Sequence, residues 1–246
     1  MAAIRYPLAA HLSLQEFFTR PLRKTARPIA AADLVSPADG LVTVIGRVGS
    51  DGRLEQIKGS SYSLGAFLTC QPSSCSPGAA LYYAVIYLGP GDYHRIHSSS
   101  DWLLCDRTHC PGDLFPVNPS LLKHIPALFS LNERVVLTGT WRHGFYSLTA
   151  VGAYNVGSIH LNVEPDLQTN VSDHSYGTDA SGQPIAHRRR IGPMQIEKGQ
   201  EIGRFMLGST VVLVWEAPEQ FTFNVIPGQK ILMGQNIGSV IDDPPK

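Results

Sequence analysis

Glycine and proline interrupt this chain so often that they limit which kinds of secondary structure it can form. The 246 residues include 23 glycines and 18 prolines, and the apolar runs between them are short. Long helices do not tolerate this spacing, because glycine loosens a helix and proline breaks it. Residues 41–45, 81–88 and 134–138 are short runs rich in β-branched, aromatic or other apolar residues, which is typical of strands. The sequence therefore predicts a mainly β fold, with a compact sandwich-like or barrel-like core of short strands and a few amphipathic helices near the N-terminus.

The balance of positive and negative charges argues against one class of binding partner. Twenty basic residues are matched by twenty acidic residues, 43% of the chain is hydrophobic and 16% is charged. A chain without excess positive charge is poorly suited to a polyanion, so we expect no nucleic-acid partner. Its length is sufficient for a substantial core, in one domain or in two closely joined ones.

Four cysteines fall into two pairs with the same spacing. Cys70 and Cys75 form one pair and Cys105 and Cys110 the other, each with four residues between its members, and His109 precedes the last cysteine. The pattern leaves open a zinc site or a disulfide. Zinc knuckles use closer pairs, however, and the cysteines are too few for a disulfide-stapled secreted domain. We therefore expect ordinary thiols and no metal ion.

The N-terminal part of the chain contains a candidate helix in residues 12–24. Apolar residues that share a helical face come first and basic residues follow, namely Leu12, Phe17 and Phe18, then Arg20, Arg23 and Lys24. An apolar face beside a basic end suits the surface of an anionic membrane. Amphipathicity alone does not identify what the face packs against, so a short helix packed on the core is an equal alternative.

No part of the chain is predicted to cross a membrane as a helix. The apolar runs are strand-like and far shorter than the roughly eighteen residues that a spanning helix needs. No signal peptide is visible at Met1, so we expect any targeting segment to be missing from this sequence.

The longest polar stretch of the chain lies in residues 166–190. It has no apolar periodicity, which predicts a long exposed loop. Short apolar runs return after it, in residues 201–205, 211–215 and 228–240, and predict a last group of strands. We place no catalytic residue in the loop.

Three short motifs contain residues with catalytic potential. Ser209 follows Gly208 and stands at the entrance to a predicted strand, although a serine beside a glycine often marks no more than a turn. Asp39, in the segment SPADG, is compatible with a turn residue that binds its own backbone. His94 and His97 are three positions apart, which suits either two surface residues or half of a metal site.

Taken together with other segments, these motifs resemble the phosphatidylserine decarboxylase family. The further segments stand in the family's order: GDYHRIHS at 91–98, FPVNP at 115–119, NERVVL at 132–137, VGA at 151–153, VGS at 156–158, and KGQEIG at 198–203. The resemblance extends from about residue 14 to residue 240 and is greatest with the mitochondrial branch. Ser99 departs from it, because the family commonly has a proline at this place, and this puts the local loop shape in question.

The resemblance implies that the chain is a precursor that cuts itself. Asp39, His97 and Ser209 stand where the family has three residues that cooperate in self-cleavage. By the resemblance, Asp39 would orient the base, His97 would be the base, and Ser209 would be the nucleophile, an arrangement that serine hydrolases also use. Ser209 would attack the carbonyl of Gly208, and the cut between these two residues would convert Ser209 into a covalent pyruvoyl group. This group is the cofactor of the family.

The implied reaction is that of a carboxy-lyase, which converts phosphatidylserine to phosphatidylethanolamine and carbon dioxide. The substrate amine would form a Schiff base with the pyruvoyl group, which accepts the electrons that the departing carbon dioxide leaves behind. His94 stands where the family has the acid that returns a proton to the carbon. An imidazole suits this role because it titrates near working pH.

The resemblance also implies an organisation and a location. Residues 1–34 would be a helical segment that faces the membrane, and residues 35–246 a catalytic β domain. Cleavage would divide the chain into a β chain of residues 1–208 and an α chain of residues 209–246 that remain associated. The protein would bind phosphatidylserine as a peripheral protein of the mitochondrial inner membrane, with a bacterial-type or other membrane location as the alternative. A homodimer is left open.

Two other classes of function remain as alternatives. A serine hydrolase could use the same Asp39, His97 and Ser209, although no Gly-x-Ser-x-Gly motif surrounds the serine. A non-catalytic β module that binds a lipid surface would use the glycine-rich tail only for turns. Both alternatives predict an uncut chain.

Overall fold

Strands dominate the structure, and helices are limited to three short stretches of the described residues. The computed structural model describes residues 4–7, 10–57, 60–72, 75–118, 122, 124–153, 158–171, 185–206 and 209–241. The helices are α1 Leu14–Phe18, α2 Leu64–Leu68 and α3 Leu128–Leu131. The strands are β1 Leu34–Val35, β2 Gly40–Arg47, β3 Arg53–Ile57, β4 Ser60–Ser63, β5 Ala79–Leu88, β6 Arg95–His97, β7 Trp102–Cys110, β8 Arg134–Trp141, β9 Gly144–Val151, β10 Ile159–Leu161, β11 His187–Ile196, β12 Glu201–Phe205, β13 Ser209–Pro218, β14 Phe221–Phe223, β15 Lys230–Ile231 and β16 Asn236–Val240. The mainly β prediction is confirmed.

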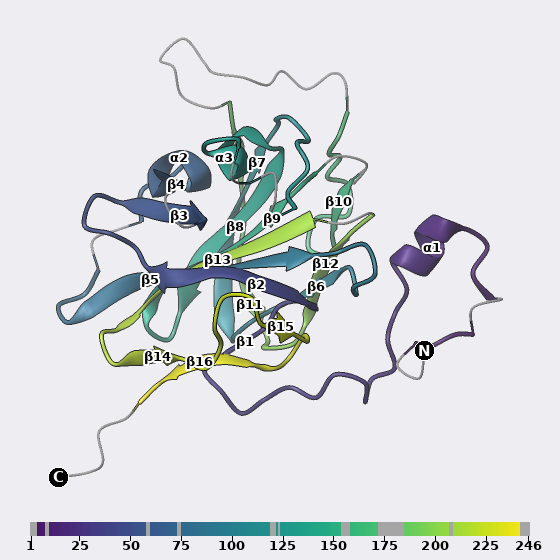
Figure 1. The fold of residues 1–246 in the computed structure, drawn as a ribbon, viewed down its shortest axis with the longest axis horizontal. Coiled ribbons are helices and arrows are strands. Elements are labelled where there is room, and N and C mark those ends of the chain that lie inside the picture. The colour runs from purple at the N-terminus through teal and green to yellow at the C-terminus, as the bar shows by residue number, and fades with distance from the viewer. Residues whose placement is uncertain are drawn as a thin grey trace.

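An eight-stranded antiparallel sheet forms the body of the molecule (Figure 1). Its strands run in the order β11-β7-β8-β9-β13-β5-β2-β15. Strand β13 lies inside this sheet and pairs with β5 along its whole length, from Ser209 opposite Leu88 to Pro218 opposite Ala79. Its other edge pairs with β9. The last part of the chain is therefore built into the middle of the sheet.

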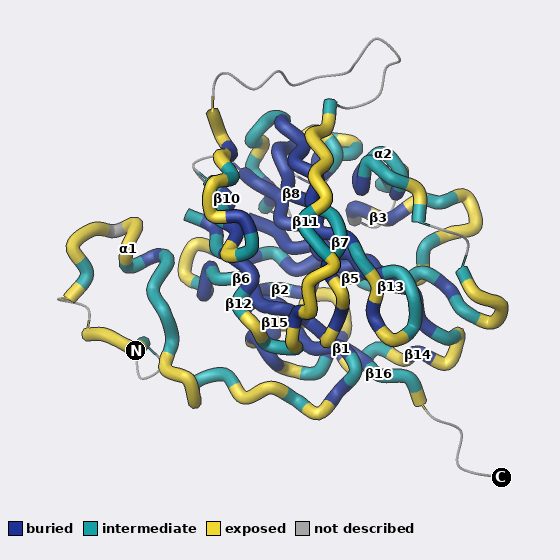
Figure 2. Tube along the Cα trace, turned by 180° about the vertical axis from the view of Figure 1, so that it is seen from behind, coloured by how far each residue is buried: buried dark blue, intermediate teal, exposed yellow. Residues whose placement is uncertain are grey.

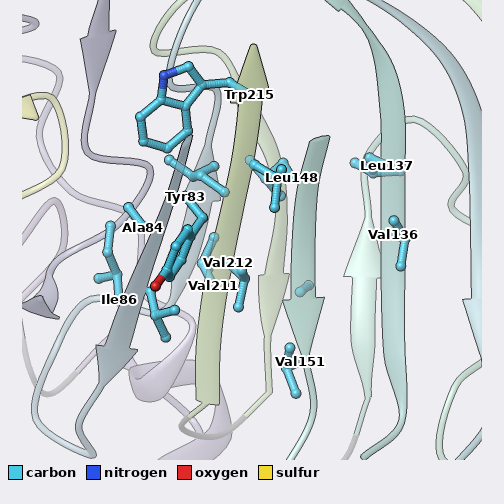
Figure 3. Packing of buried hydrophobic residues seen from close by; sticks show 14 of the residues in the cluster. Tyr83, Ala84, Ile86, Val136, Leu137, Leu148, Val151, Val211, Val212 and Trp215 are labelled. Atoms are coloured by element: carbon cyan, nitrogen blue, oxygen red, sulfur yellow. The ribbon is translucent and has the colours of Figure 1, made fainter. Parts of the chain in front are cut away.

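The core is centred on β13 because this strand is covered on both faces. Every residue from Ser209 to Ala217 is buried. Figure 3 shows Val211, Val212 and Trp215 of this strand packed among side chains of the neighbouring strands. Full burial of one aliphatic or aromatic side chain stabilises a fold by about 1.5–3 kcal/mol. An uninterrupted apolar run of this kind is what a strand with two buried faces requires.

The outer strand β11 differs from the prediction for this region. Residues 166–190 are expected to be a loop, but His187–Ile196 forms an edge strand paired with β7. Its residues 187–190 are exposed, as the yellow colour along this strand in Figure 2 shows. An edge strand has one open side, so its polar side chains can remain in water and leave no apolar pattern in the sequence. Residues 172–184 of the predicted loop lie outside the described residues.

A small sheet, β10-β12-β6, lies beside the end of the large sheet at which β5 ends and β13 begins (Figure 1). Residues 89–94 lead from β5 to β6 there, and β12 ends at Phe205, shortly before β13 begins at Ser209. The predicted histidines and the predicted cleavage site are on these segments or beside them, so the fold gathers them at one end of the large sheet.

The N-terminal segment contains one helix among its described residues, the five-residue α1. Ser13 caps it by accepting a hydrogen bond from the backbone N–H of Glu16, and the Glu16 carboxylate accepts from the backbone N–H of Leu12. Phe18 is buried, whereas Leu12 is 96% exposed. The segment thus supports both earlier alternatives, because one aromatic side chain packs on the body and one apolar side chain faces outward.

No helix in the described part of the chain is long and apolar enough to span a bilayer.

Candidate active site

Ser209 is the first residue of β13, as the sequence predicts. It lies opposite Leu88 at the end of β5 and is completely buried. Its Oγ has no hydrogen-bond partner among the described residues. Gly208, on the other side of the predicted cut, lies outside the described residues. Buried hydroxyls without a described partner also occur at Ser147, Thr149 and Thr210, so Ser209 is distinguished by its place directly after Gly208 at the start of β13.

Asp39 reaches the same end of the sheet through β2. Gly40 pairs with Ile231 of β15, and Leu41 pairs with Tyr87 of β5. Gly40 therefore lies level with Leu88, and Leu88 lies level with Ser209, so two strand spacings, about 10 Å, separate the strand ends. The fold brings Asp39 and Ser209 to the same end of the sheet, two strands apart, although they are far apart in the sequence.

The carboxylate of Asp39 is held by an arginine and by the C-terminal tail. Arg27 donates to both carboxylate oxygens, through Nε at 2.9 Å and through Nη2 at 2.5 Å. The backbone N–H of Met233 donates to Oδ1 at 2.8 Å. Asp39 is thus more than a turn residue, because its side chain joins the N-terminal segment, β2 and the tail. Its charge is balanced by Arg27.

His97 is fixed in one tautomer by two hydrogen bonds. Its Nδ1 lies 2.9 Å from the carbonyl oxygen of Gly199, which can only accept, so Nδ1 carries the proton. Burial lowers the pKa of His97, which favours the neutral ring with a lone pair on Nε2. This lone pair accepts from the Tyr93 hydroxyl at 2.9 Å. His97 is therefore ready to act as a base, with its basic nitrogen directed at Tyr93.

His94 has one ring nitrogen bound and one without a partner. Its Nδ1 donates to the carbonyl oxygen of Asp92 at 2.8 Å, and its Nε2 is buried with no described hydrogen-bond partner. The ring packs against Phe18 with centroids 4.0 Å apart. Burial lowers the pKa of His94 to about 4, so the imidazole is neutral at neutral pH. The basic nitrogen is thus available to a group that enters the site.

Backbone contacts bring both histidines to the other predicted residues. The N–H of His97 donates to the carbonyl of Pro37, two residues before Asp39, at 2.8 Å. The carbonyl of His94 accepts from the N–H of Phe205 at 2.9 Å, at the point where the chain leaves β12 toward Ser209. The segments that precede Asp39 and Ser209 therefore both contact the short histidine segment.

The predicted triad is not connected by hydrogen bonds among the described residues. Asp39 binds Arg27 and Met233, His97 binds Gly199 and Tyr93, and the hydroxyl of Ser209 binds no described group. The structure brings these residues into one region, and their individual roles remain predictions. Sequence reasoning missed Arg27 and Tyr93. Tyr93 directly precedes His94 in the histidine motif, which was the available signal, whereas Arg27 is recognisable only from the folded chain.

Groups that could hold a metal are limited in the described residues. No cluster of three or more histidine, cysteine, aspartate and glutamate side chains suitable for a metal ion is found there. All four cysteines are free thiols. The two histidines of the motif point their Nδ1 atoms at different backbone carbonyls.

The fold and the site together describe a β-rich protein with a buried serine at the start of a central strand and two buried histidines on a segment at the same end of the large sheet. A model of the family described as phosphatidylserine decarboxylase matches residues 14–239. The chain therefore belongs to the phosphatidylserine decarboxylase family, which confirms the resemblance seen in the sequence.

Named relatives are similar over most of this chain. The mitochondrial phosphatidylserine decarboxylase proenzyme of Rattus norvegicus is 44% identical over 253 residues, which cover 95% of this chain and 62% of that protein. The corresponding protein of Pongo abelii is 45% identical, covering 93% of this chain and 60% of that protein. The mitochondrial phosphatidylserine decarboxylase proenzyme 1 of Saccharomyces cerevisiae is 35% identical, covering 95% of this chain and 64% of that protein. The chain thus spans about three fifths of the length of these relatives.

Proposed function

We propose that this chain is the catalytic part of a self-processing phosphatidylserine decarboxylase, which converts phosphatidylserine to phosphatidylethanolamine and carbon dioxide. Membership of the family supports this activity, as do the names of the relatives, each of which is called a proenzyme. The observation that carries the proposal is the hydroxyl of Ser209, which is buried without a described partner and directly follows Gly208.

Self-cleavage would begin at Ser209 Oγ. A buried hydroxyl without a partner costs about 1–3 kcal/mol, which is understandable where that hydroxyl is consumed in a reaction. The oxygen would attack the carbonyl carbon of Gly208, and the peptide nitrogen would leave, so that an ester replaces the peptide bond. Elimination would release residue 208 as a carboxylate, and addition of water with loss of ammonia would leave Ser209 as a pyruvoyl group. Gly208 has no side chain to obstruct the attack.

His97 and Asp39 would support this attack in different ways. His97 is neutral and could accept the proton of the serine hydroxyl at Nε2. In the structure this nitrogen accepts from Tyr93, so the Tyr93 hydroxyl must either relay the proton or turn aside. Asp39 would act through its position and charge, since its hydrogen bonds go to Arg27 and Met233.

His94 would serve the decarboxylation. The pyruvoyl group would supply a conjugated carbonyl that accepts the electrons left by carbon dioxide, which no ordinary side chain can do. His94 is neutral in the structure, so its Nε2 must take up a proton before it can give one to the product carbon. The ammonium group of the substrate is a source of that proton. The buried, unpartnered Nε2 fits this sequence of accepting and then donating.

The organisation and location of the protein form part of the proposal. Residues 1–34 would face the membrane, and residues 35–246 would form the catalytic domain, cut into chains of residues 1–208 and 209–246. Relatives named as mitochondrial support a mitochondrial location. Within it, we propose a peripheral position at the inner membrane, where phosphatidylserine is the partner. A homodimer is left open.

Replacement of Ser209 tests the proposal directly. Ser209→Ala removes the attacking atom and the precursor of the pyruvoyl group, so we expect one uncut chain on a denaturing gel and no release of carbon dioxide from phosphatidylserine. Ser147→Ala is the matched control, because Ser147 is also fully buried in the large sheet with an unpartnered Oγ. We expect this variant to cut itself and to remain active. Two chains in Ser209→Ala would exclude the proposed site of cleavage. An uncut wild-type chain would favour the serine hydrolase or the non-catalytic module.

A further inference from the structure

Arg20 is a half-buried arginine with which no described carboxylate forms an ion pair. Seven arginines form ion pairs with aspartate or glutamate, namely Arg27, Arg47, Arg95, Arg107, Arg142, Arg188 and Arg189. The guanidinium of Arg20 instead binds two backbone carbonyls, those of Phe17 at 3.2 Å and Gly91 at 3.5 Å. It also lies 4.7 Å from the ring centre of Phe17. Its Nε is buried and has no described partner. The cation is therefore partly desolvated and still has an unused donor.

The backbone of the Arg20 segment is fixed against the histidine strand. Phe18 packs on the ring of His94, and the carbonyl of Thr19 accepts from Arg95 Nε at 2.9 Å. These contacts fall on the two residues directly before Arg20, so the backbone that carries its side chain is held against the segment of His94 and Arg95. The contact with Gly91 adds a link to the connection that contains both His94 and Tyr93.

The charges around Arg20 leave its positive charge incompletely balanced. Burial lowers the pKa of Arg20, and the negative charges of Asp39 and Asp92 oppose this effect. The Asp92 carboxylate accepts a hydrogen bond from the backbone N–H of Gly89. Asp39, however, is already paired in two places with Arg27. The positive charge of Arg20 also contributes to the lowered pKa of His94, which shows that the two groups are electrostatic neighbours. An anion that enters beside His94 would therefore meet a prepared cation.

Leu12, Arg20 and His94 are increasingly buried, and their chemical character follows the order of groups in a phospholipid. Leu12 is exposed at the outer end, Arg20 is half-buried, and His94 is buried at the inner end. In phosphatidylserine the acyl chains come first, the phosphodiester follows, and the amine and carboxylate of serine are last. We propose that Arg20 is a substrate-binding residue that holds the phosphodiester of the phospholipid while the serine group reaches the site beside His94. This assignment rests on the proposed function.

Two anionic groups of the substrate could bind an arginine, and the chemistry favours the phosphodiester. The carboxylate must lose its negative charge when carbon dioxide leaves, and an ion pair with arginine would stabilise the ground state against that loss. The phosphodiester retains its charge from substrate to product. An arginine on the phosphodiester therefore strengthens binding without opposing the reaction, and its planar donors suit two phosphate oxygens.

Kinetics with a soluble short-chain phosphatidylserine test the proposal without interference from membrane binding. In Arg20→Gln we expect the KM to rise by about tenfold to a hundredfold, the range for loss of charged hydrogen bonds, with self-cleavage intact and kcat within about threefold. Arg20→Lys keeps the charge but loses the planar donors, so we expect a smaller rise. Arg190→Gln is the matched control, because Arg190 is an exposed arginine on the edge strand β11 and has no proposed part in binding or catalysis. Its KM should equal that of the wild type.

A binding measurement separates failure of this inference from failure of the proposed function. Saturation-transfer NMR with glycerophosphoethanolamine probes the phosphodiester alone, and L-serine probes the carboxylate alone. We expect Arg20→Gln to weaken only the first signal, a result that does not depend on turnover. An unchanged KM and an unchanged glycerophosphoethanolamine signal would overturn the assignment of Arg20, as would a fall in kcat alone. A wild-type chain without decarboxylase activity would contradict the proposed function instead, and the NMR comparison would still decide the anion site.

Discussion

His97 illustrates how the site depends on residues that are not expected to react. Both of its ring nitrogens are occupied, one by the Gly199 carbonyl and one by the Tyr93 hydroxyl. Tyr93 is itself buried, and burial raises the pKa of its hydroxyl, so it donates as a neutral phenol. The lone pair that would receive the proton of Ser209 is therefore oriented by Tyr93.

Replacement of Tyr93 should slow self-cleavage. Tyr93→Phe leaves Nε2 of His97 buried without its donor and frees the ring to turn, so we expect cleavage about tenfold slower, which corresponds to about 1.4 kcal/mol. The rate of appearance of two chains on a denaturing gel measures this. Tyr82→Phe is the control, because it removes a tyrosine hydroxyl that binds the carbonyl of Pro218 at the other end of β13. Faster cleavage in Tyr93→Phe would mean that Tyr93 holds His97 away from Ser209.

The site residues differ in how far the sequence could predict them. Asp39, His94, His97 and Ser209 were selected by motifs that match a family, and the structure gathers them at one end of the large sheet. Tyr93 lies within the histidine motif, but Arg27 follows no motif, because its hydrogen bond to Asp39 depends on how two segments meet after folding. The expected link from Asp39 to His97 is absent among the described residues for the same reason, since Arg27 occupies the carboxylate.

At the scale of elements, the close approach of β2 and β5 makes Gly40 necessary. A Cβ atom at this position would lie 2.4 Å from the carbonyl oxygen of Tyr87, which is too close for any side chain. Gly40→Ala must therefore shift β2, and with it Asp39, at a cost of about 1–3 kcal/mol. We expect a lower midpoint of urea unfolding and slower self-cleavage. Gly91→Ala is the matched control, because nothing lies within 4 Å of its Cβ position. Equal unfolding midpoints for both variants would contradict the packing described here.

The outer end of the α1 segment should contribute to membrane binding. Leu12 is 96% exposed, whereas Phe18 is committed to packing on His94, so Leu12 is the apolar side chain that is free to enter a lipid surface. In Leu12→Ser we expect less sedimentation with anionic vesicles and unchanged self-cleavage. The remaining binding should weaken as salt rises, because Arg23 and Lys24 are exposed nearby. Ile226→Ser is the control, since Ile226 is 68% exposed on the C-terminal tail. An equal loss in both variants would exclude a specific role for α1.

The sequence predicts those strands whose burial requires a run of apolar residues. Residues 81–88 and 211–215 lie in β5 and β13, which are buried in the middle of the large sheet, and their apolar runs mark them clearly. The edge strand β11 was missed because its exposed arginines obey no such pattern. A helix was predicted within residues 12–24, and α1 forms there over only five residues. The equally short helices α2 and α3 were not predicted, since four or five residues are too few for a helical period to be recognised.

At the scale of the whole molecule, the predicted cut would not separate the fold into two independent parts. Ser209 opens β13, which pairs with β5 on one side and with β9 on the other. The chain that follows it also provides β15 and β16, which pair with β2 and β1. Residues 209–246 would therefore remain bound to residues 1–208 after cleavage, held by the sheet and by the buried side chains of β13.

The central claim is that this chain cuts itself before Ser209 and retains both pieces, and the mass of the purified protein tests it most directly. We expect one peak in native gel filtration that separates under denaturing conditions into two masses, one for residues 1–208 and one for residues 209–246. The second piece should resist Edman degradation, because a pyruvoyl group has no free amine. A single mass of 26.8 kDa, that of the uncut chain, would contradict the account.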